Sequence, residues 1–136
     1  MSTADAWACG ERTMTPEGRL RESVLQPWER YAALGIHLSP LVGLLLGPLW
    51  LAALAAPLVI WLIYRERSSF VDDHGREMIN VGLSLLILHV ILALTIIGIV
   101  LYPVLWIITL IGMVRGAIAA SNQEYFRYPV TIRPLR

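Results

Sequence analysis

The chain has few charged residues and no lysine at all. Only 15% of its 136 residues are charged, and all eleven basic residues are arginine. A soluble domain typically carries about a quarter charged residues, so this shortage indicates that a lipid bilayer is part of the chain's solvent. The net charge of +1 provides no global attraction for nucleic acid, and no nucleic-acid partner is expected.

Cysteine is nearly absent as well. Cys9 is the only one, which excludes an intrachain disulfide and leaves the redox compartment undefined. The residues before it, MSTADAWA, contain neither a basic start nor an apolar run. We therefore expect no signal peptide and no lipoprotein anchor, and membrane insertion is expected to depend on the chain's own apolar segments.

Two long apolar runs occupy the middle of the sequence, and residues 31–64 and 78–114 contain no formally charged side chain. As single helices they would be roughly 50 and 55 Å long, against a hydrocarbon core of about 30 Å. Each run is predicted to break into two helices, at Gly47–Pro48 and between Gly98 and Pro103, because proline removes a backbone donor. The predicted fold is an all-α, integral membrane four-helix bundle made of two transmembrane hairpins, with helices at 28–46, 48–64, 78–98 and 102–120.

The arginines gather at one end of this predicted bundle. With a four-span domain over 28–121, the N-terminal tail 1–27, the connector 65–77 and the C-terminal tail 122–136 share one side of the membrane. All eleven arginines lie in or beside these segments, including Arg115 near the end of the fourth helix. The positive-inside bias predicts a multi-pass protein of the bacterial cytoplasmic (inner) membrane with both termini in the cytoplasm.

The N-terminal tail shows one weak pattern. Leu20, Val24, Leu25 and Trp28 would share one face of a helix. A short helix lying on the membrane surface and a disordered tail explain this pattern about equally well.

The connector between the two runs predicts the start of a helix. Ser69 and Asp72 have capping-box spacing, which favours a helix that begins near Ser69 and continues into the third span. One face of this helix carries a polar stripe that descends into the membrane: Asp73, His74, Glu77, Asn80 and Ser84.

The upper part of this stripe resembles a metal or acid–base site in composition only. Asp73, His74 and Glu77 lie on a single helix, and their spacing matches no established metal motif. Asp72 and Asp73 can instead pair with Arg76 at helical spacing. We therefore predict no catalytic residue, no bound metal and no cofactor here.

The lower part of the stripe predicts contacts between helices, since polar side chains in a span avoid lipid. His37 lies at a depth similar to that of Asn80 and Ser84, which predicts a hydrogen bond between the first and third spans; Thr109 is a third candidate partner. His89 lies deeper. It is expected to bond a backbone carbonyl through one ring nitrogen, and a proton path is the alternative.

Small residues recur at every fourth position in the first and fourth spans, a spacing that lets helices approach closely. Packing within one chain and oligomerisation explain these stripes equally well. Their members are Gly35, Ser39, Gly43 and Gly47 in the first span, and Gly112, Gly116 and Ala120 in the fourth.

Three segments together resemble a known family. WERYAALGIHLSPL, PLVIWLIYRERSSFVDDHGREMIN and EYFRYPVTIR are similar to the bacterial small four-span membrane proteins of domain of unknown function 4870. That family is described as similar to the twenty-kilodalton Tic subunit of the chloroplast import translocon. The resemblance covers about residues 28–133 and implies a four-span membrane protein without an established catalytic activity.

Residues that match the family's pattern occur in all three segments: His37, Leu38 and Ser39, then Pro57, Leu58 and Trp61, then His74, Glu77 and Asn80, and finally Tyr128 and Pro129. The candidate motif or interaction residues are Asp73, His74, Glu77, Arg115, Tyr128 and Pro129.

Three functions are compatible with these observations. The one favoured is a non-enzymatic scaffold or accessory subunit of a membrane complex, translocon-like by resemblance only, with the lipid bilayer and a membrane-protein partner or a second copy as its contacts. The alternative is a small oligomeric transporter or channel that uses the intramembrane polar stripe. A lipid-modifying enzyme acting through Asp73, His74 and Glu77 is the least favoured.

Overall fold

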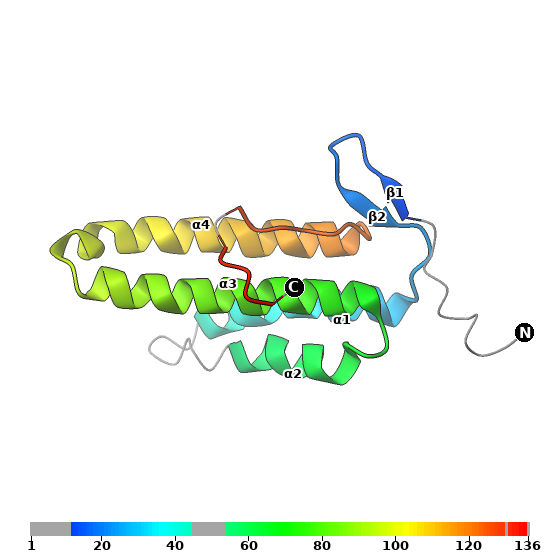
Figure 1. Ribbon diagram of the computed structural model, residues 1–136, viewed down its shortest axis with the longest axis horizontal. Helices are drawn as coiled ribbons and strands as arrows, with labels where there is room; N and C mark the ends of the chain where they lie inside the picture. The colour runs from blue at the N-terminus through cyan, green and yellow to red at the C-terminus, as the bar shows by residue number, and fades with distance from the viewer. Residues whose placement is uncertain (1–11, 45–53, 130, 136) are drawn as a thin grey trace, which may run out of the picture.

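The computed structural model describes residues 12–44, 54–129 and 131–135. Two short strands precede four helices (Figure 1): β1 Arg12–Met14, β2 Leu20–Glu22, α1 Pro27–Leu44, α2 Ala55–Tyr64, α3 Ser69–Ala93 and α4 Ile96–Ser121. The helices form a bundle in which α1 and α3 each pack against the other three. A helical bundle is therefore confirmed, with a small β-hairpin that the sequence did not predict.

The second apolar run turns at a different place from the one predicted. Helix α3 ends at Ala93 and α4 begins at Ile96, whereas Pro103 lies inside α4. Thr95 makes the turn in an extended conformation, which suits its β-branched side chain, and its hydroxyl donates to the Leu92 carbonyl at 3.2 Å. Gly98 lies inside α4 and does not end a helix. A Cβ there would lie 1.8 Å from the Leu92 carbonyl oxygen, so glycine permits the close approach of α4 to the end of α3.

In the first apolar run, residues 31–64, the structure describes residues 31–44 and 54–64. The predicted break at Gly47–Pro48 lies outside the described residues, and the described part of α2 begins at Ala55. The helix predicted to begin near Ser69 does begin there, but Ser68 is its N-cap, with the hydroxyl accepting from the Val71 amide at 3.2 Å.

Residues 12–22 form a β-hairpin rather than a surface helix or a disordered tail. β1 pairs antiparallel with β2, and Gly18 adopts a positive φ of 75° in the turn between them. On its other edge β2 pairs with the chain that follows α4: the Glu22 amide donates to the Gln123 carbonyl and the Tyr125 amide to the Leu20 carbonyl. A pairing partner about a hundred residues away stabilises the extended conformation, which no local pattern could reveal.

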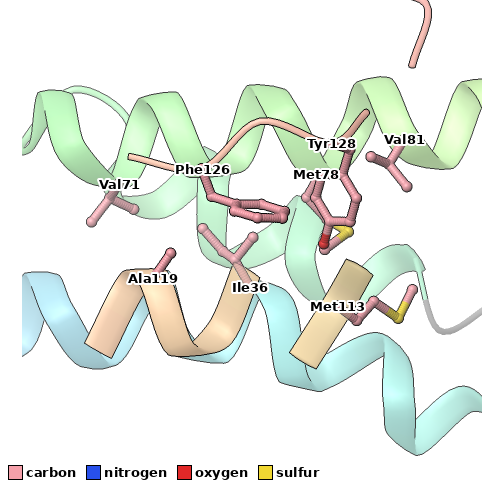
Figure 2. Packing of buried hydrophobic residues seen from close by; sticks show 8 residues of the cluster. All are labelled: Ile36, Val71, Met78, Val81, Met113, Ala119, Phe126 and Tyr128. Carbon is pink, nitrogen blue, oxygen red and sulfur yellow. The ribbon is translucent and has the colours of Figure 1, made fainter. Parts of the chain in front are cut away.

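The C-terminal segment, defined here as residues 122–129 and 131–135, is not a free tail. It turns back at Gln123, whose φ of 63° is left-handed, and runs along α3 and α4 (Figure 1). Phe126 and Tyr128 enter the core and point toward Ile36 (Figure 2). The rest of this core cluster consists of Val71, Met78, Val81, Met113 and Ala119.

The outer surface of the bundle is apolar along most of its length. Within the described ranges two helices, α3 and α4, are long and apolar enough to cross a membrane by length and composition. The outward side chains of α4 are largely exposed, for example Ile96 at 89% and Ile99 at 77%. The ion pairs of the described residues instead lie around the β-hairpin, the connector between α2 and α3, the start of α3 and the C-terminal segment. The molecule therefore has one charged end and one apolar end.

A buried histidine–tyrosine network as the candidate functional site

Three buried polar side chains from distant parts of the chain form a connected network. His37 on α1 and His74 on α3 are fully buried, and Tyr128 in the C-terminal segment is 5% exposed. His37 Nδ1 lies 3.0 Å from the Tyr128 hydroxyl, and His37 Nε2 lies 2.8 Å from His74 Nδ1. His74 Nε2 in turn lies 3.1 Å from the Glu124 carbonyl oxygen.

The carbonyl at one end determines the direction of every hydrogen bond in the network. Because a carbonyl only accepts, His74 carries its proton on Nε2 and donates to Glu124. The Nδ1 of a neutral His74 then accepts from the Nε2–H of His37. This leaves Nδ1 of a neutral His37 as the acceptor for the Tyr128 hydroxyl.

The Tyr128 hydroxyl is well suited to be the donor. Burial raises the pKa of the Tyr128 phenol well above its ordinary value, and the nearby Glu77 carboxylate raises it further. The hydroxyl therefore keeps its proton. With both imidazoles neutral, every hydrogen bond of the network has a donor and an acceptor, so the network fixes the relative positions of α1, α3 and the C-terminal segment. It ends at a carbonyl, which accepts a hydrogen bond and has no proton to donate.

Two glycines of α4 provide the space that the rings occupy. A Cβ at Gly116 would lie 2.6 Å from His37 Nδ1, and a Cβ at Gly112 would lie 2.7 Å from Tyr128 Cε1. The small-residue stripe predicted on this helix therefore packs against ring side chains from α1 and the C-terminal segment of the same chain.

The backbone of the C-terminal segment is anchored by Glu77 on α3. This carboxylate is 3% exposed and accepts a hydrogen bond from the Tyr128 amide at 2.8 Å. Arg133 pairs with the same carboxylate at 3.2 Å and also donates to the Tyr128 carbonyl. A buried charge with a hydrogen-bonded partner is costly to break on one side only, so Glu77 holds this segment in place.

Glu124 joins the network to the β-hairpin through its side chain. The carboxylate pairs with Arg19 at 3.1 Å and also with Arg21. Burial acts to raise the pKa of Glu124, but the hydrogen bonds and charges of Arg21 and Arg19 outweigh burial and lower it below its ordinary value. The carboxylate is therefore ionised where the fold is intact.

The hydrogen bond predicted from His37 to Asn80 or Ser84 is wrong. Both ring nitrogens of His37 are used by His74 and Tyr128. The depth of His37 correctly predicts a neighbour on α3, but the rotation of α3 presents His74 to α1 instead of Asn80 or Ser84.

Asn80 and Ser84 bind the C-terminal segment. The side chain of Asn80 donates from Nδ2 to the backbone carbonyl of Leu135 at 2.9 Å, and its Oδ1 accepts from the backbone N–H of Leu135 at 3.1 Å. The Ser84 hydroxyl accepts from the Ile132 amide at 2.9 Å and donates to the carbonyl of Asn80. The C-terminal segment, predicted to be a cytoplasmic tail, thus covers the lower part of the polar stripe of α3.

The remaining candidates have local or surface partners. Asp72 pairs with Arg76 as expected, whereas Asp73 pairs with Arg127 rather than with Arg76. His89 Nδ1 donates to the Leu85 carbonyl at 2.7 Å, and the Thr109 hydroxyl donates to the Leu105 carbonyl. Pro129 and Arg115 line a surface cleft. Among the described residues no group of three or more metal-ligating side chains converges.

Sequence reasoning missed the role of two groups in this network. His74 was predicted as part of the polar stripe and as a candidate interaction residue, but without a contact to His37. The Glu124 carbonyl gave no signal, because a backbone acceptor has no sequence signature.

The fold and the network together define a small helical protein with an apolar outer surface, one charged end and a polar network that fixes a returning C-terminal segment. Residues 29–135 match the MamF/MmsF family, the magnetosome magnetite crystal formation protein family, and the chain belongs to this family. No curated protein and no solved structure matches the chain.

The family match corrects the resemblance drawn from the sequence. The segments that resemble domain of unknown function 4870 and the Tic subunit lie within residues 29–135, which match the magnetosome family instead. Short apolar helices with a few histidines and a tyrosine-proline ending are therefore too general to separate these groups, and the translocon-like interpretation has no support.

Proposed function

We propose that this chain is a multi-pass protein of the magnetosome membrane that takes part in magnetite crystal formation as a non-enzymatic scaffold or accessory subunit. The family supports the membrane and the process. The observation that carries the non-enzymatic role is the buried network itself: the hydrogen-bonding capacity of His37, His74 and Tyr128 is used within the chain.

The proposed topology is two transmembrane hairpins, α1–α2 and α3–α4, with the charged end in the cytoplasm. The separation of charged and apolar ends supports it, because the ion pairs surround the β-hairpin and the start of α3 while the α3–α4 turn carries no charge. Both termini and the connector then lie on the cytoplasmic side.

Cysteine labelling tests this topology. In a Cys9→Ser background, Glu66→Cys places a thiol on the connector and Thr95→Cys places one at the α3–α4 turn; both native side chains are exposed. A membrane-impermeant maleimide should label the first from the cytoplasmic side only and the second from the opposite side only. Labelling of both positions from the same side would contradict the two-hairpin topology.

Deletion in a magnetite-forming host tests the process. Crystals are expected to become smaller or misshapen while the membrane vesicles remain, and the wild-type gene should restore them. Unchanged crystals would contradict a role in crystal formation.

Two further measurements test the non-enzymatic role. Asp73→Asn removes the partly exposed carboxylate of the Asp73–His74–Glu77 cluster and should restore crystals as well as the wild type does. A variant that folds and inserts but fails to restore them would point to chemistry at this cluster. The native mass after gentle extraction should include a reproducible second protein, whereas a lone copy of the chain would argue against an accessory subunit.

A further inference from the structure

A cleft at the charged end of the bundle lies between α4, the β-hairpin and the C-terminal segment. Its volume is about 460 Å³. Three arginines, Arg19, Arg115 and Arg127, are among its lining residues, and no acidic residue is among them. Tyr125, Phe126 and Pro129 supply an apolar side to the same cleft.

The positive charges of this cleft are only partly neutralised. Arg127 pairs with Asp73, and Arg19 shares the single carboxylate of Glu124 with Arg21. Arg115 is exposed and has no ion pair or hydrogen bond among the described residues. The cleft and its immediate partners therefore carry an excess of positive charge that an anion can neutralise.

The position of Arg115 relates the cleft to the apolar surface. It lies on α4 next to Val114, and Ile111 and Ile118 are also exposed on the same helix, at 52% and 53%. An arginine that follows a long apolar stretch of a membrane helix places its guanidinium at the level of the lipid headgroups. A ligand bound here would have its anionic group in the cleft and apolar chains along α4.

We propose that this cleft binds the phosphate of an anionic phospholipid headgroup, with Arg115 as the principal contact and Arg19 and Arg127 beside it. Arginine is the side chain best suited to a phosphate, because its planar fork donates two parallel hydrogen bonds. The proposal rests on the membrane location given under the proposed function. A free phosphate has the same anionic chemistry, and the experiment below separates the two sources.

The test measures lipid binding to the purified full chain in a neutral detergent by native mass spectrometry. The probes are phosphatidylglycerol, phosphatidylethanolamine and inorganic phosphate. We expect phosphatidylglycerol to bind more tightly than phosphatidylethanolamine, and inorganic phosphate to compete poorly because it lacks the acyl chains. Arg115→Gln should weaken phosphatidylglycerol binding about fivefold, the effect of one basic side chain near an anionic lipid.

Arg30→Gln is the matched control, since it removes the same charge from an exposed position on α1 that does not line the cleft. It should change the affinity less than about twofold. Equal effects of the two variants, or equal affinity for the two lipids, would overturn the proposal in favour of general electrostatic adhesion. Inorganic phosphate binding as tightly as phosphatidylglycerol would overturn the lipid as the source.

The ratio of the affinities for phosphatidylglycerol and phosphatidylethanolamine tests the lipid site, and the cysteine labelling tests the topology, so the two proposals can be refuted separately. Correct labelling with no preference for phosphatidylglycerol removes the lipid site alone. Incorrect labelling removes the bilayer placement on which the proposed function depends, whatever the affinity ratio measured in detergent.

Discussion

Gly116→Ala is the sharpest perturbation of the polar network, because a single added methyl group meets a fully buried ring. The new Cβ would lie 2.6 Å from His37 Nδ1 and 2.7 Å from Cε1. Ordinary contacts between such atoms are about 3.5 Å or longer. The imidazole of His37 must therefore retreat by roughly 1 Å, in a space bounded by Phe126, Tyr128 and His74.

The size of the effect follows from three terms. Forcing extra volume into a packed core costs about 1–3 kcal/mol. A retreat of this size also lengthens or misaligns the hydrogen bond between His37 and Tyr128, and a buried polar group left without its partner costs about 1–3 kcal/mol. Alanine is favoured over glycine inside a helix by about 1 kcal/mol, which offsets part of the loss. The net expectation is a destabilisation of about 1–5 kcal/mol.

Reversible unfolding in mixed micelles, followed by circular dichroism, measures this change. Gly35→Ala is the control, since Gly35 belongs to the other small-residue stripe and its added Cβ would meet only Ile60 Cδ1, at 3.5 Å. That variant should be unchanged or more stable by up to about 1 kcal/mol. If Gly116→Ala were as stable as Gly35→Ala, the close approach of α4 to His37 and the reasoning built on it would be refuted.

Three further predictions concern the groups around the network. Tyr128→Phe removes the donor to His37 Nδ1 and should destabilise the fold by about 1–3 kcal/mol. In the same unfolding assay the control Tyr31→Phe, at a position that is 67% exposed, should have no measurable effect. Equal effects of the two variants would contradict the assigned hydrogen bond. Glu77→Gln should make the C-terminal segment accessible to limited proteolysis. Asp73→Asn, whose ion pair is more exposed, should lower the free energy of unfolding by no more than about 1 kcal/mol. A C-terminal segment that stays protected in Glu77→Gln would argue against Glu77 as its anchor. The pKa of Glu124 is lower in the folded state than its ordinary value of 4.5, so its contribution to stability is complete above pH 4.5 and is lost as the pH falls through the lowered pKa. Glu124→Gln should therefore lose less stability than the wild type between about pH 6 and about pH 3. Parallel curves of unfolding free energy against pH for the two proteins would exclude this carboxylate as a source of the acid sensitivity.

Local rules predicted those parts of the fold that depend on local interactions. The apolar runs located the helices, and the Ser–Asp pattern located the start of α3 within one residue of the observed cap at Ser68. The helix break predicted near Pro103 is wrong, because Pro103 lies exposed inside α4. A proline there removes only one local backbone hydrogen bond, and the helix continues.

Long-range pairing explains what the sequence could not predict. The extended conformation of residues 20–22 depends on pairing with residues 123–125, and the partners of His37 depend on the rotation of α3 and on where the chain returns after α4. Polar spacing showed that a span must hide its polar groups, but it could not identify the segment that would cover them. In this fold that segment is the one predicted to be an unattached tail.

The sequence separation of the network has a consequence for how the molecule forms. His37 belongs to the first helix and its partner Tyr128 comes after the fourth, so the first histidine is synthesised long before the hydroxyl that completes its hydrogen bonding. Contacts this distant in sequence form late, because the loop between them must close first. The four helices can therefore form as they are made, while the packing of α1 against α3 becomes fixed only after the C-terminal segment has folded back. A chain without the C-terminal segment would hold its helices without that final constraint, because His37 would lack the hydroxyl that donates to its Nδ1.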